Sequence, residues 1–161
     1  GHSPTDTIFV RSDGLMIGGD HLLPEISSNP VLSRDFVSSA STDDLVRYRS
    51  LPAYLESLEE TARMTIDLIL PGHGEPFRGH AELVADRMEM HHARSDQMLS
   101  ALSAGAQDAI SIARRIWGDV AEEQPFLTFS EVLGHMDVLL DDGAVVEHYD
   151  EDSDSWFFAL K

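Results

Sequence analysis

Three short glycine-rich stretches constrain this sequence more than any other feature. They read GHSP at residues 1–4, GGDH at residues 18–21 and PGHG at residues 71–74. Each stretch holds one candidate metal ligand, and in chain order these are His2, Asp20 and His73. Glycine lets a backbone turn tightly around a ligand, and neutral histidine together with carboxylate suits zinc and related divalent metals. The three stretches therefore predict a metal centre.

Short runs of β-type residues precede two of these stretches. Residues 7–10 and 15–17 flank an Asp13-Gly14 pair, which is typical of a hairpin turn, and residues 67–70 run directly into PGHG. A strand fixes the backbone up to its last residue, so a ligand that follows a strand is well positioned. We therefore expect Asp20 and His73 to lie at strand ends.

The other elements of the first part of the chain are a loop and two helices. Residues 24–44 are polar and rich in serine, which predicts a long surface loop. A helix is predicted to open at Pro52, because proline is favoured at the first helical position, and a longer helix is predicted over residues 80–102.

The composition changes at residues 103–105, which read Ser-Ala-Gly, and this change predicts a boundary between two domains. The predicted domains are residues 1–104 and residues 105–161. In the second, a helical face runs from Ile110 to Trp117, and a capping box at residues 128–131 is expected to open another helix. Two strands, residues 145–149 and 156–160, follow. Helix, helix and hairpin is the element order of a winged helix.

Charge and composition exclude several classes of function. The 161 residues include 11 Lys and Arg against 29 Asp and Glu, for a net charge of −18. Nucleic-acid binding and anionic membrane binding both need basic surface, so neither is expected. There is no cysteine, which excludes disulfides and thiolate zinc sites. The apolar runs are too short to span a membrane, and we expect a cytoplasmic protein.

In its motifs and in their order, the sequence resembles the metallo-β-lactamase superfamily. GHSP resembles the third metal motif, Gly19-Asp20 the fourth and PGHG the fifth. The resemblance implies an α/β fold: the C-terminal half of an αββα sandwich followed by a small winged-helix-like α+β domain. It also implies two zinc ions, with iron or manganese as alternatives, where His2 binds the first metal, His73 the second and Asp20 both.

The resemblance further implies a metal-activated water that attacks a thioester, a lactone or a similar acyl bond of a small molecule. Asp20 and His21 are the residues it places in the reaction. His21 directly follows the bridging carboxylate, where it would act as a donor to the metal ligands or as a substrate contact. A packed, hydrogen-bonded histidine is the alternative interpretation of His21.

One departure from the superfamily pattern limits what the chain can do alone. The His-x-His-x-Asp-His motif, which supplies the remaining ligands, does not occur in the sequence. We therefore expect a fragment of a larger hydrolase, with weak or absent metal binding and no activity alone. An exposed half-fold surface would favour a homodimer. The alternative is a non-catalytic protein-binding or regulatory module on a degenerate scaffold.

Overall fold

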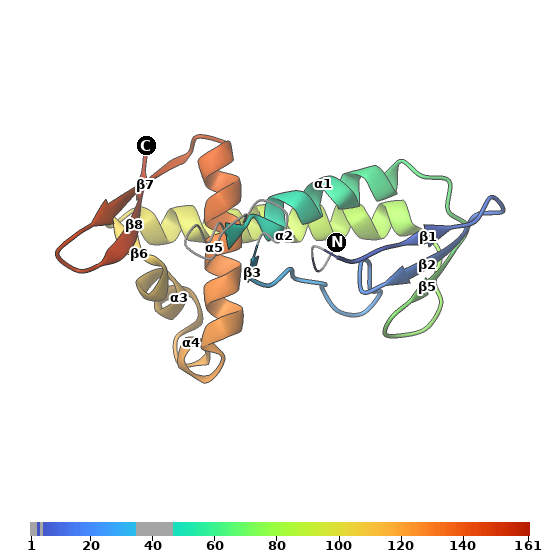
Figure 1. Ribbon diagram of the computed structural model, residues 1–161, viewed down its shortest axis with the longest axis horizontal. Helices are drawn as coiled ribbons and strands as arrows, with labels where there is room; N and C mark the ends of the chain where they lie inside the picture. The colour runs from blue at the N-terminus through green and yellow to red at the C-terminus, as the bar shows by residue number, and fades with distance from the viewer. Residues whose placement is uncertain (1–2, 4, 35–46) are drawn as a thin grey trace. The chain divides into compact units, whose positions relative to one another are not determined.

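The computed structural model describes residue 3, residues 5–34 and residues 47–161 (Figure 1). The chain divides into two compact units, Gly1–Glu89 and Met90–Lys161. The long helix α2 (His80–Leu102) has the bounds that the sequence predicts, and it contributes residues to both units. No helix among the described residues is both long enough and apolar enough to cross a membrane.

A sheet of three strands forms the centre of the first unit. Its strands are β1 (Phe9–Val10), β2 (Leu15–Gly19) and β5 (Leu68–Pro71), in the order β1-β2-β5. β1 is antiparallel to β2, as expected for a hairpin, whereas β5 lies parallel to β2. The parallel pair matters for the site, because parallel neighbours end at the same edge of a sheet.

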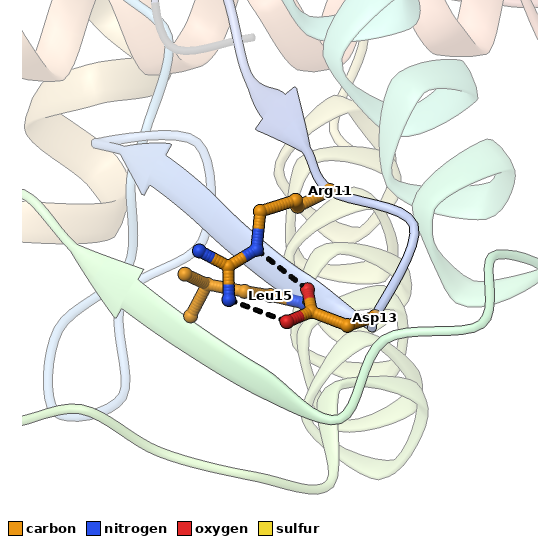
Figure 2. A network of polar contacts seen from close by, with 3 residues as sticks. All are labelled: Arg11, Asp13 and Leu15. Atoms are coloured by element: carbon orange, nitrogen blue, oxygen red, sulfur yellow. Dashed lines mark hydrogen bonds and ion pairs between the residues drawn. The ribbon is translucent and has the colours of Figure 1, made fainter.

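The predicted turn between β1 and β2 is present. Gly14 has a positive φ of 84°, and its N–H donates to the carbonyl of Arg11 at 3.0 Å. Figure 2 shows the Arg11 guanidinium making two contacts with the Asp13 carboxylate; one is a 2.7 Å hydrogen bond from Nε. That hydrogen bond lowers the pKa of Asp13 to about 2. Because both side chains are exposed, the pair contributes little to stability.

One face of this sheet is buried and the other is exposed. Met16 and Ile69 are fully buried, whereas the Ile17 side chain, which follows Met16 in the pleat, is 52% exposed. The helices α1 (Ser50–Ala62) and α2 lie on one side of the sheet (Figure 1). The buried apolar residues of the unit form its core: Met16, Leu22, Leu23, Leu51, Tyr54, Leu58, Ile69 and Val84. Helix α1 begins two residues before the predicted Pro52.

The predicted loop over residues 24–44 is wrong in part. Residues Ser33–Arg34 form a short strand, β3, which pairs in antiparallel fashion with β4 (Arg47–Tyr48). Ser28 is buried with 3% of its surface exposed, so this segment is not wholly at the surface. A two-residue strand is too short to show an alternating pattern in the sequence. Its hydrogen-bond partner also lies more than ten residues away, so no hairpin turn marks it. Residues 35–44 of the predicted loop lie outside the described residues.

The second unit contains the predicted helices and hairpin. Its elements are β6 (Gln107–Asp108), α3 (Ala109–Trp117), α4 (Val120–Glu123), α5 (Pro125–Asp141), β7 (Val145–Asp150) and β8 (Ser155–Leu160). The strands form an antiparallel sheet in the order β6-β8-β7. The Asp108 carboxylate caps α3 by accepting from the Ser111 N–H at 2.9 Å. A buried cluster that includes Met98, Ile112 and Met136 forms the core.

The capping box predicted at residues 128–131 is wrong. Helix α5 begins at Pro125, so Thr128 and Ser130 lie inside it. Both are buried, and their hydroxyls donate back to the carbonyls of Gln124 at 3.1 Å and Phe126 at 2.6 Å. Such bonds within a helix satisfy a serine or threonine without a cap. Proline at the first helical position was the better signal for the start.

Candidate metal centre

A β-bulge ends strand β2 beside the candidate site. Ile17 is opposite Leu70 and Gly19 is opposite Pro71, so Gly18 is an extra residue in β2. A side chain at Gly18 would lie 3.2 Å from the Met16 methyl and 3.3 Å from Ile69 Cγ2. Only glycine therefore fits this position without moving the core. A bulge changes the direction in which the next side chains leave a strand.

A tight turn follows the bulge and carries the candidate ligand Asp20. The His21 N–H donates to the Gly18 carbonyl at 3.1 Å, and Gly19 has a positive φ of 52°. Glycine adopts this left-handed conformation without a steric cost. Asp20 thus directly follows the last residue of β2, as the sequence predicts.

The second candidate ligand, His73, follows the neighbouring parallel strand β5. Its Nε2 lies 3.6 Å from Oδ1 of Asp20. The His73 side chain is 70% exposed and the Asp20 side chain 36% exposed, so solvent reaches both. Two residues that are 53 positions apart in the sequence, 73 minus 20, are therefore neighbours at one edge of the sheet.

Gly72 lies tightly against Gly19 and Asp20. Its N–H donates to the Gly19 carbonyl at 2.6 Å. A Cβ at position 72 would lie 2.2 Å from Asp20 Oδ1 and 3.0 Å from the carbonyl carbon of Gly19. The sequence marked Gly72 only as part of a tight loop. Its contact with Asp20 follows from the pairing of β2 with β5, for which the local sequence holds no signal.

The described donors form only part of a metal site. Carboxylate and imidazole are ligands that zinc and similar metals accept, and Asp20 and His73 are close enough to belong to one centre. His2, the third predicted ligand, lies outside the described residues. Within the part of the chain that the structure describes, no group of three or more His, Cys, Asp or Glu side chains is placed to hold a metal ion. The donors fit a metal in kind but are too few.

His21 is packed rather than exposed. It is 3% exposed, and its Nε2 lies 2.8 Å from the Thr61 hydroxyl oxygen. That hydroxyl donates to the Ser57 carbonyl at 2.8 Å, so we infer that His21 Nε2 carries the hydrogen and donates to Thr61. The Tyr54 hydroxyl donates to the His21 carbonyl at 3.0 Å. This is the packed, hydrogen-bonded arrangement that the sequence left as an alternative.

Burial also determines the protonation state of the His21 ring. It lowers the pKa of His21 to about 4, so the ring is neutral near pH 7. The ring borders a small cavity of about 230 Å³, to which Asp6 and Glu60 also contribute. A role for His21 in contacting substrate stays a prediction.

Replacement of Thr61 by valine is expected to destabilise the first unit. The change keeps the volume but removes the acceptor for His21 Nε2 and leaves a buried donor unpaired, which costs about 1–3 kcal/mol. Urea unfolding followed by circular dichroism measures the loss. Thr65→Val, at an exposed position, is the matched control and should change stability by less than about 0.5 kcal/mol. Equal stability of the two variants would contradict the hydrogen bond.

The loop after His21 is held beside the loop that carries His73. Nη2 of Arg87 on α2 donates to the carbonyls of Leu23 at 3.2 Å and of Pro24 and Ile26 at 3.4 Å. A Cβ at Gly74 would lie 3.1 Å from Pro24 Cγ, so the two loops are in close contact. Arg87 therefore links the helix to the loop that borders the candidate site.

The chain was compared with known proteins in sequence and in fold, and both comparisons found metal-dependent or β-lactamase-like relatives. No family model matches the chain. A protein of Bacillus subtilis (strain 168), named probable metallo-hydrolase YqjP, is 30% identical over 151 residues, which are 93% of this chain and 46% of that protein. A β-lactamase domain protein from Burkholderia ambifaria is 28% identical, with a TM-score of 0.78 over 100% of this chain and 46% of its own.

A second solved structure supports the fold alone. A metallo-β-lactamase family protein from Thermus thermophilus is 22% identical, with a TM-score of 0.77 over 100% of this chain and 47% of that protein. The chain thus spans about half the length of the relatives it matches, which is consistent with the predicted half-fold. The resemblance found in the sequence is confirmed: the chain is similar in sequence to a probable metallo-hydrolase and in fold to metallo-β-lactamase family proteins.

Proposed function

We propose that the chain supplies part of the metal centre of a metal-dependent hydrolase, and that the substrate is a small thioester, lactone or similar acyl compound. The observation that supports the proposal is the 3.6 Å separation of Asp20 and His73 at the ends of two parallel strands. The comparison with a probable metallo-hydrolase points to the same class. The carboxyl ends of parallel strands are a common place for ligands and substrates in α/β proteins.

In this proposal Asp20 and His73 hold the metal, and His2 completes the set of ligands from this chain. A bound divalent metal supplies Lewis acidity toward water and toward a carbonyl oxygen. Asp20 has two carboxylate oxygens and can therefore serve two metal ions. Gly72 keeps the space that the Asp20 carboxylate occupies, and Arg87 holds the loop that borders it. The nucleophile is then water, so no serine or cysteine is needed.

The remaining ligands are expected from the other half of the complete fold. One exposed sheet face supports this arrangement, since the paired residues Phe9 and Ile17 are 64% and 52% exposed. In the complete protein we propose that the second half of the αββα sandwich covers this face. In the chain alone the same face favours self-association, which is the homodimer expected from the sequence.

We propose a winged-helix fold for the second unit. The order β6-α3-α4-α5-β7-β8 and the pairing of β8 with both β6 and β7 support it. The tip of the β7-β8 hairpin is acidic, with Asp150, Asp152 and Asp154 close together in the sequence, so DNA is not the partner. A cytoplasmic location belongs to the same proposal and rests on the absence of cysteine.

Substitution of the two ligands tests the proposed function. In the complete protein loaded with zinc, Asp20→Asn and His73→Ala are each expected to lower metal affinity and hydrolysis by about 100-fold or more, since even residues that only support a metal ligand contribute about 10–100-fold. His92→Ala, at an exposed histidine of α2, is the matched control and should leave both unchanged. Full activity in either ligand variant would overturn the assignment.

Elemental analysis of the 161-residue chain alone tests the half-site. We expect less than one tightly held metal per chain, because a zinc site normally has four ligands and the described residues bring together two. Two tightly held zinc ions per chain would contradict the proposed division of the ligands between two halves.

A further inference from the structure

An apolar groove lies on the second unit, and none of the described residues of the candidate metal centre lines it. It has a volume of about 640 Å³ and is formed by α3, α4 and the first turns of α5, which pack against one another (Figure 1). Its apolar lining is Ile110, Ala113, Ala121, Pro125, Phe126 and Phe129. This is within the size range of functional binding sites.

Large apolar side chains protrude beside the groove. Ile110 of α3 is 55% exposed and Phe126 of α5 is 57% exposed, and both line the groove. Leaving such side chains in water forfeits the free energy of burying them. Exposed apolar side chains gathered at one groove often mark an interaction site.

The rim of the groove carries one charge of each sign. Arg114 Nε and Glu122 Oε1 both belong to the lining and lie 3.5 Å apart, with 62% and 68% of their side chains exposed. Both groups are therefore accessible to an approaching surface. Since cation and anion flank the same groove, the surface has no preference for a purely basic or purely acidic partner.

We propose that this groove is the contact between two copies of the chain, related by a twofold axis. Such an interface uses the same patch on both copies, so the patch must be complementary to itself. The patch has the parts that such an interface needs: an exposed phenylalanine beside an apolar hollow, and an arginine and a glutamate that pair within one copy and can make the same pairing across the interface. Phe126 of one copy enters the groove of the other, and Arg114 of each copy pairs with Glu122 of its partner.

The competing occupants fit the surface less well. Nucleic acid would need a basic surface, and this chain has a net charge of −18. A partner of opposite charge would need a rim of one sign, whereas the rim carries the pair Arg114 and Glu122. The proposal does not depend on the hydrolase function, because the groove lies in a different unit from Asp20 and His73.

Sedimentation equilibrium over a range of concentrations tests the proposal. All chains carry Phe9→Thr and Ile17→Thr, which remove the exposed sheet face of the first unit as a source of association. In this background we expect a monomer–dimer equilibrium that Phe126→Ser weakens by about tenfold or more, as for a buried aromatic anchor. Val146→Thr, at a residue of β7 that is 43% exposed, should not weaken it. Circular dichroism confirms that each variant is folded.

A charge-exchange experiment tests the pairing of the rim. Arg114→Glu gives a rim with two anions and Glu122→Arg a rim with two cations, so each variant alone should dimerise about tenfold more weakly. An equimolar mixture of the two variants should form a heterodimer at least as readily as the native rim forms a homodimer. A loss of stability within one copy cannot produce this recovery on mixing.

Three results would overturn the proposal. The first is a monomer at every concentration in the Phe9→Thr and Ile17→Thr background. The second is a dimer that Phe126→Ser leaves unchanged. The third is a mixture of the two charge variants that associates no better than either variant alone.

Discussion

Replacing Gly72 with alanine is expected to remove most metal binding and hydrolysis from the complete protein, although Gly72 is not itself a ligand. The new Cβ would lie 2.2 Å from Asp20 Oδ1, far inside contact distance, so the carboxylate has to move. A displaced metal ligand loses its affinity much as a deleted one does, and we expect a loss of about 100-fold in metal affinity. Competition with a chromophoric chelator measures it.

The same change should also destabilise the first unit. The Cβ would lie 3.0 Å from the carbonyl carbon of Gly19, which is backbone and cannot swing aside. Overpacking of this kind costs about 1–3 kcal/mol. The matched control is Gly19→Ala, where nothing lies within 4 Å of the new Cβ but φ is 52°. That control loses about 1 kcal/mol through its backbone and should keep more metal affinity.

The loss of metal affinity and the loss of stability can be distinguished. If Gly72→Ala loses stability but holds metal as tightly as the unsubstituted protein, then Asp20 is not a ligand. If it loses neither, the close approach of β2 and β5 is wrong. Zinc content and urea unfolding on the same samples distinguish these cases.

The second large effect is a loss of stability in acid that depends on His135. This residue of α5 is 1% exposed, and its Nδ1 lies 3.0 Å from the Ser95 hydroxyl on α2. Within the described residues, its Nε2 has no hydrogen-bond partner. The His91 ring, also buried, lies 5.5 Å away between centroids. The adjacent His92, by contrast, is exposed.

Burial lowers the pKa of His135 to about 3, and the charges of His91 and Arg94 act in the same direction. Arg94 is itself paired with Glu131 at 2.9 Å. In the unfolded chain a histidine takes up its proton at about pH 6.5. Between these two values the unfolded state binds more protons than the folded state. The contribution of His135 to stability is therefore full above about pH 6.5 and declines as the pH falls toward about 3.

We expect this decline to amount to a loss on the order of 3 kcal/mol between about pH 7 and pH 4. His135→Gln removes the titrating ring but keeps a polar partner for Ser95, so its stability should depend less steeply on pH. His148→Gln, at an exposed histidine of β7, is the matched control and should keep the native slope. Urea midpoints measured at several pH values give the slopes. Identical slopes for native and His135→Gln chains would rule out this origin of the acid sensitivity.

The sequence predicted the elements that local patterns specify and missed those that depend on distant contacts. Helix α2 and the β7-β8 hairpin follow from local periods and turn residues, and their predicted bounds agree with the structure to within a residue. The predicted start of α5 was wrong, because the Thr128 hydroxyl is satisfied equally well inside the helix by the Gln124 carbonyl. Strand β3 exists only through its pairing with β4, so no local pattern marks it.

By itself the sequence determined the resemblance to the metallo-β-lactamase superfamily, the candidate ligands Asp20 and His73, and the expectation of a half-fold. Those conclusions rest on short motifs, in which the residue types needed for the chemistry are adjacent along the chain. Only the tertiary structure decided that β5 lies parallel to β2, that Gly72 touches Asp20, and that His21 is buried against Thr61. Each of these joins residues at least 40 positions apart, and such pairings depend on packing rather than on local pattern.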